Sequence, residues 1–361
     1  MHAVDLHLEP NEASDLCPVF DAAVLEREGW DRAFVTVLDE AKAKRAIAVL
    51  GHEEGAGQEA GWHAVRLKCK PSRKGKTEDA EAAARRGGWI YVLGSQFGRK
   101  DGPLQPRRSW IARVREEELA AGLSGKRPRL ELARLRFGLH RAINDALAGA
   151  AVDLLGLGPR TRSAYIDQTI ARGAAKKKRW AGRVTSADHP VNVEGAAFRA
   201  NGRMLLGLRY PVTAAGQAIL VELDHVDAIF EDPDAVPRCS HVWVLEGVGS
   251  PRAPVGVRAL HGDDADGFDA VVGNLDAAGK GAVILEDHPH GAKATSAHVH
   301  FTLPLTAGGG HVSTRLVHDF ERLRRVEGLA VAPDGHVHYV VDEEGHVALR
   351  TVLVKDGAGV A

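Results

Sequence analysis

Repetition constrains this 361-residue chain more than any other feature. A short segment that reads apolar, polar, small, apolar occurs five times, and each copy is followed by a polar or glycine-containing turn. Turns of this kind supply the positive φ that tight hairpins need. The copies lie at 20–23, 62–65, 193–196, 257–260 and 326–329. Short strands joined by hairpins and repeated in this way are typical of a β-propeller.

Each copy is followed by a second and a third apolar strand. Second strands are predicted at 34–38, 89–93, 204–208, 268–272 and 338–341. Third strands are predicted at 46–50, 109–114, 218–222, 282–285 and 346–350. Five units predict an all-β propeller of five blades, and six blades remain an alternative.

The N-terminal segment 3–8 alternates apolar and polar residues, as a half-exposed strand does. We expect it to form the outer strand of the last blade, because propellers are usually closed in this way. A frayed terminus is the alternative interpretation.

One stretch departs from the strand pattern. From Glu116 to Trp180 the apolar spacing becomes helical, which predicts a helical insertion at 116–180 between the second and third blades of a single domain, 1–361. The insertion ends in the basic run 176–179, and two further basic segments, 68–76 and 99–108, flank the second blade. These segments predict a basic rim, although a run such as 176–179 also occurs in solvated loops.

Composition excludes several classes of protein. The 47 basic and 48 acidic residues give a net charge of -1, which argues against nucleic acid as a partner. No apolar window is long enough to span a membrane, and no secretory signal is visible. Three widely spaced cysteines without a Cys-x-x-Cys pair argue against a disulfide framework. We therefore expect a cytoplasmic protein that does not associate with membranes.

A polar residue occupies the same slot in each of the five repeated segments. Because the first strand of each propeller blade lines the central channel, these five side chains are predicted to meet at one level. Crowded charged groups must pair, bind a cation or shift their pKa values. The residues are Asp21, His63, Glu194, Arg258 and Glu327.

Two interpretations of this predicted ring remain open. In the first, Asp21, Glu194 and Glu327 hold Ca²⁺ or another divalent cation through oxygen ligands. His63 would then be the general base and Arg258 would stabilise a developing anion, in metal-assisted hydrolysis of an ester or phosphoester. In the second, Arg258 pairs with Glu194 and Glu327 and simply neutralises the channel.

A second set of polar residues stands at the ends of the second strands, where a propeller commonly binds ligands. Acidic residues after a strand are also ordinary turn formers, which is the alternative for the two aspartates of the set. An arginine in an apolar strand usually meets a planar acceptor. The predicted ligand-binding residues are Asp39, Ser95, Arg209, Asn274 and Asp342.

Histidine is abundant, with 18 in the chain. His298 and His300 point to the same face of a predicted strand and would bind a metal if a third ligand lay nearby. An incidental polar face is the alternative interpretation.

Four motifs resemble those of a known family. Residues 192–197 followed by 206–211 resemble its N-I-E-G-L-A and G-L-R-x-P segments, and 256–260 resemble its G-I-R-D-L segment. Residues 91–96 and 37–40 resemble its Y-x-x-G-S-H and D-D-E segments. The chain thus resembles, over most of residues 19–354, a bacterial β-propeller family catalogued as domain-of-unknown-function family 3616.

The resemblance implies a propeller fold and no settled activity. The chain also departs from the family pattern, since Gln96 stands in place of a histidine and Ala259 in place of an aspartate. We therefore expect a binding module that takes a small anionic ligand or an acidic protein partner through its channel and basic rim. The metal-assisted hydrolase is the alternative.

Overall fold

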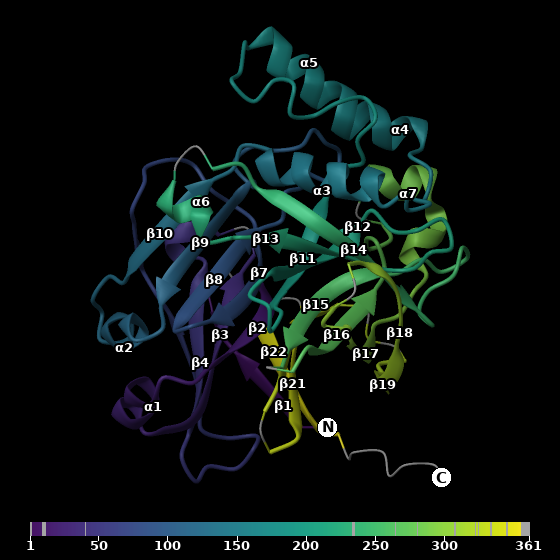
Figure 1. Cartoon of the computed structure of the whole chain (residues 1–361). Coiled ribbons are helices and arrows are strands. Elements are labelled where there is room, and N and C mark those ends of the chain that lie inside the picture. The colour runs from purple at the N-terminus through teal and green to yellow at the C-terminus, as the bar shows by residue number, and fades with distance from the viewer. Residues whose placement is uncertain are drawn as a thin grey trace.

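Strands dominate the computed structural model, and they form five separate sheets (Figure 1). The structure describes residues 2–8, 12–39, 41–232, 235–263, 265–279, 281–306, 308–321, 323, 325–332, 334–343 and 346–354. Position 40, which belongs to one of the family motifs, lies outside these ranges.

Each sheet begins with a hairpin of apolar strands. In order of pairing, the first sheet contains β2 (Ala13–Val19), β3 (Trp30–Leu38), β4 (Ile47–Glu53) and β5 (Trp62–Arg66). The second contains β7 (Ala80–Arg86), β8 (Trp89–Gly94), β9 (Trp110–Arg115), β10 (Arg129–Arg134) and β6 (Lys70–Pro71). The third contains β11 (Asn192–Phe198), β12 (Met204–Tyr210), β13 (Ile219–Asp224), β14 (Arg238–Glu246) and β18 (Gly310–Ser313).

The last two sheets have four strands each. The fourth contains β15 (Gly256–Gly262), β16 (Gly267–Gly273), β17 (Ala297–Thr302) and β19 (Arg315–Asp319). The fifth contains β20 (Val326–Val331), β21 (His336–Glu343), β22 (His346–Leu353) and β1 (His2–Leu6). Neighbouring strands run antiparallel except at β6 and β18, which pair in parallel with β10 and β14.

The first strands of the five sheets pack against one another in a closed cycle, in the order β2, β7, β11, β15, β20 and back to β2. The two ends of the chain meet in the fifth sheet, where β1 pairs with β22 from His2 opposite Thr351 to Leu6 opposite Val347. The prediction that the N-terminal segment completes the last sheet is therefore confirmed.

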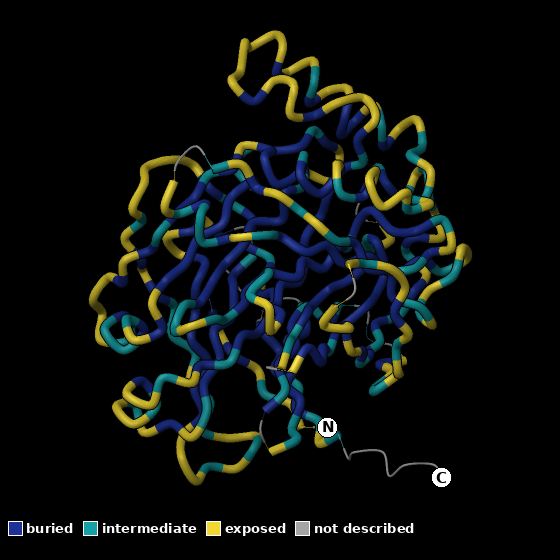
Figure 2. The backbone as a smooth tube through the Cα atoms, viewed as in Figure 1, coloured by how far each residue is buried: buried dark blue, intermediate teal, exposed yellow. Residues whose placement is uncertain are grey.

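Close approach between the first strands explains the small residues in the repeats. A Cβ atom on Gly195 would lie 2.8 Å from the Cβ of Leu260 in the neighbouring sheet. A Cβ atom on Gly328 would lie 2.9 Å from the main-chain carbon of Asp15. Apolar side chains fill the rest of the space between the sheets, so the buried backbone concentrates there (Figure 2).

The first two repeated segments were assigned to the wrong elements. Residues 20–23 form no strand, because Asp21 caps α1 (Ala22–Glu28) and accepts a hydrogen bond from the main-chain N–H of Val24 at 3.1 Å. Residues 62–65 belong to β5, which is the outer strand of the first sheet. An inner and an outer strand share the same two-residue alternation, so the pattern alone does not separate them.

The stretch 116–180 is only partly helical. It contains α2 (Glu118–Leu123), α3 (Gly138–Gly149), α4 (Pro159–Thr161), the π-helical turn η2 (Arg162–Asp167) and α5 (Gln168–Ala175). Residues 129–134 are nevertheless the strand β10, in which buried Leu130 and Leu132 flank the partly exposed Glu131. The helical prediction was therefore wrong for this segment. Figure 1 shows α4 and α5 projecting beyond the sheets.

The predicted strand at 282–285 was also wrong. Val283–Asp287 is the short helix α7, and β17 is the third strand of the fourth sheet. The remaining short helices are η1 (Ala43–Arg45), α6 (Ala228–Glu231) and η3 (Pro289–Ala292). None of the helices in the described ranges is both long and apolar enough to cross a membrane.

Candidate functional site

Every first strand contains an irregularity at the same position. The pairing with the second strand skips one residue in each sheet, and that residue is polar in all five cases. A β-bulge of this kind turns a side chain away from the regular alternation. The five bulge residues are Asp15, Glu81, Glu194, Arg258 and Glu327.

Two of the predicted ring residues lie elsewhere. Asp21 caps α1, and His63 is exposed on the outer strand β5, where its Nε2 lies 2.7 Å from Glu53. The structure therefore does not assemble Asp21 with Glu194 and Glu327, nor does it place His63 near Arg258. Asp15 and Glu81 occupy the bulges of the first two sheets instead, because the true first strands are β2 and β7.

Glu194, Arg258 and Glu327 do come together, as an ion-pair network. The Nε of Arg258 lies 3.0 Å from Glu194, and the same guanidinium pairs with Glu327. Arg209 adds a second cation, 2.7 Å from Glu194. Burial raises the pKa of Glu327 above its ordinary value, although the charge of Arg258 opposes this. These are the contacts expected from the neutralising interpretation.

A cavity of about 820 Å³ lies where the second strands end. Four of the five predicted ligand-binding residues line it: Asp39, Arg209, Asn274 and Asp342. The fifth, Ser95, is buried and donates a hydrogen bond to Asp79, which also lines the cavity. The ends of the second strands therefore surround one cavity, even though two of the first strands were assigned wrongly from the sequence.

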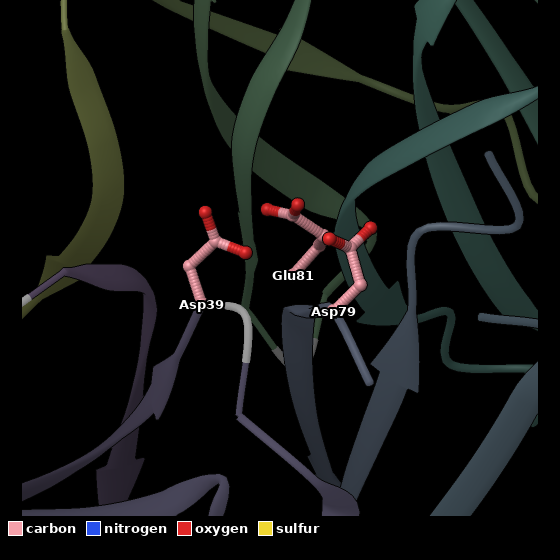
Figure 3. A group of neighbouring side chains, drawn as sticks. All are labelled: Asp39, Asp79 and Glu81. Carbon is pink, nitrogen blue, oxygen red and sulfur yellow. The ribbon is translucent and has the colours of Figure 1, made fainter. Parts of the chain in front are cut away.

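Three carboxylates face one another in the cavity (Figure 3). Oxygen atoms of Asp39, Asp79 and Glu81 all lie within 4.8 Å of one another. Asp39 follows β3, Asp79 precedes β7, and Glu81 is the bulge residue of β7. Segments of two neighbouring sheets therefore bring three carboxylates together. We call Asp39, Asp79 and Glu81 the acidic cluster.

Two carboxyl groups of the acidic cluster have raised pKa values. Burial raises the pKa of Asp79 to about 6, even though Arg108 lies 2.8 Å away and Ser95 donates a hydrogen bond. Burial also raises the pKa of Glu81 well above its ordinary value, and the charges of Asp39 and Asp79 raise it further. Such a cluster requires protons or a bound cation to relieve the repulsion.

The basic rim meets the cavity at Arg99, Lys100, Arg107 and Arg108, and the last two of these pair with carboxylates. Arg107 and Arg108 both pair with Glu78, and Arg325 lies 3.4 Å from Asp342. The basic run 176–179 is exposed beyond the end of α5 and does not line the cavity.

Sequence reasoning missed Asp79 and Glu81, although part of the signal was present. Residues 80–83 read Ala-Glu-Ala-Ala, which is a weak copy of the apolar, polar, small, apolar segment. Alanine in place of valine made this copy less distinct than Trp62-His63-Ala64-Val65, which has the same pattern on an outer strand.

Comparison with known proteins gives only distant similarity. No family model and no curated protein matches the chain, so the resemblance drawn from its motifs stays a prediction. A mannose phosphorylase from Leishmania mexicana in complex with a phosphate ion is 9% identical, with 98% of this chain and 88% of that chain covered and a TM-score of 0.38. A glucose dehydrogenase is 11% identical, with 94% and 83% covered and a TM-score of 0.34.

The WD40 domain of Neurospora crassa Pan2 is 7% identical, with 96% of this chain and 92% of that chain covered and a TM-score of 0.35. All three TM-scores lie below 0.5, so these similarities say nothing about what this chain binds.

Proposed function

We propose that this protein is a five-bladed β-propeller that binds a hard divalent cation of the Ca²⁺ kind in the cavity at one end of its channel. The closed cycle of five first strands supports the blade number. The acidic cluster of Asp39, Asp79 and Glu81 carries the binding proposal, since carboxylate oxygens are the preferred ligands of Ca²⁺.

The charge balance of the cavity favours a positive ligand. Ten carboxylates and seven cationic side chains line it. Arg108, Arg209 and Arg258 already pair with carboxylates, so these three guanidinium groups are not free to receive an anion. A divalent cation between the three clustered carboxylates would relieve the repulsion that raises the pKa values of Asp79 and Glu81.

This arrangement changes two expectations from the sequence. We propose a cation in place of the small anionic ligand expected from the sequence, and we place it at the acidic cluster instead of at Asp21, Glu194 and Glu327. The hydrolase alternative loses its general base, because His63 is on an outer strand and no histidine is among the described residues that line the cavity. We therefore favour binding over catalysis.

Calcium titration of the chelator-treated protein tests the proposal. A ligand that binds only the native state stabilises it by about 2.7 kcal/mol at a hundredfold excess over its Kd. We expect Ca²⁺ to raise the melting temperature, and the Asp39→Asn/Glu81→Gln variant to lose that response. Asp276→Asn is the matched control, because Asp276 lines the same cavity outside the acidic cluster. An unchanged melting temperature, or equal responses in all variants, would refute the proposal.

A further inference from the structure

Charge is unevenly distributed along this chain, and the helical segment that projects beyond the sheets is strongly basic (Figure 1). Residues 159–183, which comprise α4, η2, α5 and the loop after them, contain eight of the 47 basic residues and one of the 48 acidic residues. This segment therefore has seven net positive charges. The rest of the chain, with 39 basic and 47 acidic residues, has eight net negative charges. The net charge of -1 conceals this separation.

Buried aromatic side chains attach the projecting segment to the body of the protein. The hydroxyl of buried Tyr165 donates a hydrogen bond to the main-chain carbonyl of Lys100 at 2.8 Å. Buried Trp180 packs edge-on against Phe137, with their ring centroids 5.0 Å apart. A Cβ atom on Gly173 of α5 would lie 2.7 Å from the Trp180 ring, so the loop after α5 packs closely against the helix. These contacts hold the segment in one orientation.

Five cationic side chains crowd the exposed end of this segment, where Figure 2 shows most of the backbone exposed. The main-chain N–H of Lys176 donates to the carbonyl of Arg172 at 3.3 Å. The N–H of Lys178 donates to the carbonyl of Gly173 at 3.0 Å, so helical turns set the spacing of these residues. All five cationic residues are exposed, and we call them the basic cluster: Arg172, Lys176, Lys177, Lys178 and Arg179.

The basic cluster lacks compensation within the chain. No carboxylate of the described residues forms an ion pair with any of its five members. Like charges four residues apart on a helix, such as Arg172 and Lys176, repel one another. The dipole of α5 stabilises cations in its last turn, which accounts for Arg172 but not for the run that follows the helix. A partner with several negative charges would relieve this repulsion.

The residues around the basic cluster distinguish between classes of polyanion. A helix that lies on a membrane presents large apolar side chains beside its cations, whereas the exposed residues of α5 are small or polar: Gln168, Ala171, Arg172, Ala174 and Ala175. Single-stranded nucleic acid stacks its bases on aromatic side chains, whereas Tyr165 and Trp180 are buried. The negative charge of the rest of the chain also repels a long polyanion that extends past the cluster. A short acidic polypeptide needs only the exposed cations.

We propose that the basic cluster is the docking site for an acidic segment of a partner protein, in which several aspartate or glutamate residues lie close together. Lysine ammonium groups bind such carboxylates as point charges and do not require a fixed geometry. Exposed charges of this kind steer association and are screened by salt. The docking site does not depend on the proposed function, because none of the five cations lines the cavity that contains the acidic cluster.

Titration of a fluorescein-labelled polyglutamate peptide with the full chain, followed by fluorescence anisotropy, tests the inference. We expect saturable binding that weakens as the ionic strength rises to about 0.15 M, where charges interact over only about 8 Å. The variant Lys176→Gln/Lys177→Gln/Lys178→Gln should bind the peptide about tenfold more weakly, because three exposed ion pairs of ordinary strength are lost together. These side chains are exposed, so the variant should melt at the same temperature as the parent.

A matched variant separates docking at the basic cluster from a general effect of charge. Arg73→Gln/Lys74→Gln/Lys76→Gln also removes three exposed cations, from the basic segment 68–76, and should bind the peptide as the parent does. Two further probes are an oligothymidylate with the same charge as the peptide and phosphatidylcholine vesicles that contain phosphatidylserine, and both should bind more weakly than the peptide. The inference is wrong if the peptide does not bind, if both triple variants lose affinity equally, or if either of the other probes binds more tightly.

Discussion

The buried carboxylate of Asp15, in the first strand of the first sheet, accepts a hydrogen bond from the main-chain N–H of Ala83 in the second sheet at 2.9 Å. Its other oxygen accepts from the N–H of Leu16 at 2.9 Å. Asp15 has a φ of +57°, a backbone conformation that aspartate and asparagine tolerate better than alanine. This bulge residue therefore joins two neighbouring sheets, whereas the other four line the cavity.

We expect Asp15→Ala to lower the free energy of unfolding by about 2–3 kcal/mol, because two buried N–H groups lose their acceptor. Asp15→Asn keeps one acceptor oxygen and should cost clearly less. Urea unfolding of the two variants measures the difference. Equal losses would mean that the acceptor oxygens of Asp15 do not account for its contribution to stability.

Removing Arg258 should lower the free energy of unfolding, because its guanidinium pairs with the carboxylates of Glu194 and Glu327. Breaking a buried ion pair on one side costs about 3–5 kcal/mol, so Arg258→Met should destabilise the protein by that order. Adding Glu327→Gln should recover part of the loss, since it removes one uncompensated charge. Arg160→Met is the control, because Arg160 and its partner Glu286 are both exposed. Denaturant unfolding of the parent, the Arg258→Met and Glu327→Gln single variants, the double variant and the Arg160→Met control tests the coupling, and strictly additive losses in the double variant would contradict it.

The affinity of the acidic cluster for Ca²⁺ should rise with pH, because its carboxyl groups must lose their protons to bind the ion. The pKa of Asp79 is raised to about 6 and that of Glu81 is raised well above its ordinary value, so protonation of these carboxyl groups competes with the cation at mildly acidic pH. A cation must displace these protons, and the Ca²⁺-induced melting shift should therefore be larger at pH 7.5 than at pH 5. Without the metal, the pH dependence runs in the opposite direction, because it then concerns the stability of the native state. Raised carboxyl pKa values stabilise the native state at low pH, and this stabilisation is lost as pH rises through about 6.

His338 should make the protein sensitive to acid. Its imidazole is fully buried beside Phe34 and Trp62, and burial lowers its pKa to about 3. The unfolded chain binds this proton near pH 6.5, whereas the native state does not, so stability falls as pH drops below about 6.5. The contribution is about 1.4 kcal/mol per pH unit in that range.

His338→Gln should flatten this dependence. The free energy of unfolding of the variant should change less than that of the parent between pH 7 and pH 5. Comparing the two proteins at each pH removes the opposite contribution of the raised carboxyl groups. Parallel pH profiles would show that His338 does not carry the effect.

The sequence anticipated the hairpin repeats and the ends of the second strands with useful accuracy. Asp39, Arg209, Asn274 and Asp342 were placed together from strand endings alone, and all four line the cavity. Errors arose where an inner strand and an outer strand share the same local pattern. His63 has the alternation of an inner strand but lies on an outer one, and Ala80–Arg86 is the true inner strand despite its weaker pattern.

By itself, the sequence determined the local elements, because hairpin turns and two-residue alternation depend on neighbouring residues. It also determined that N-terminal and C-terminal strands would share one sheet. Only the tertiary structure decided which strand of each sheet faces the ring, because this depends on which sheets pack side by side. That choice brings Asp79 and Glu81 to Asp39. Contacts between residues distant in the chain leave no periodic trace in either segment, so the acidic cluster could be found only in the folded chain.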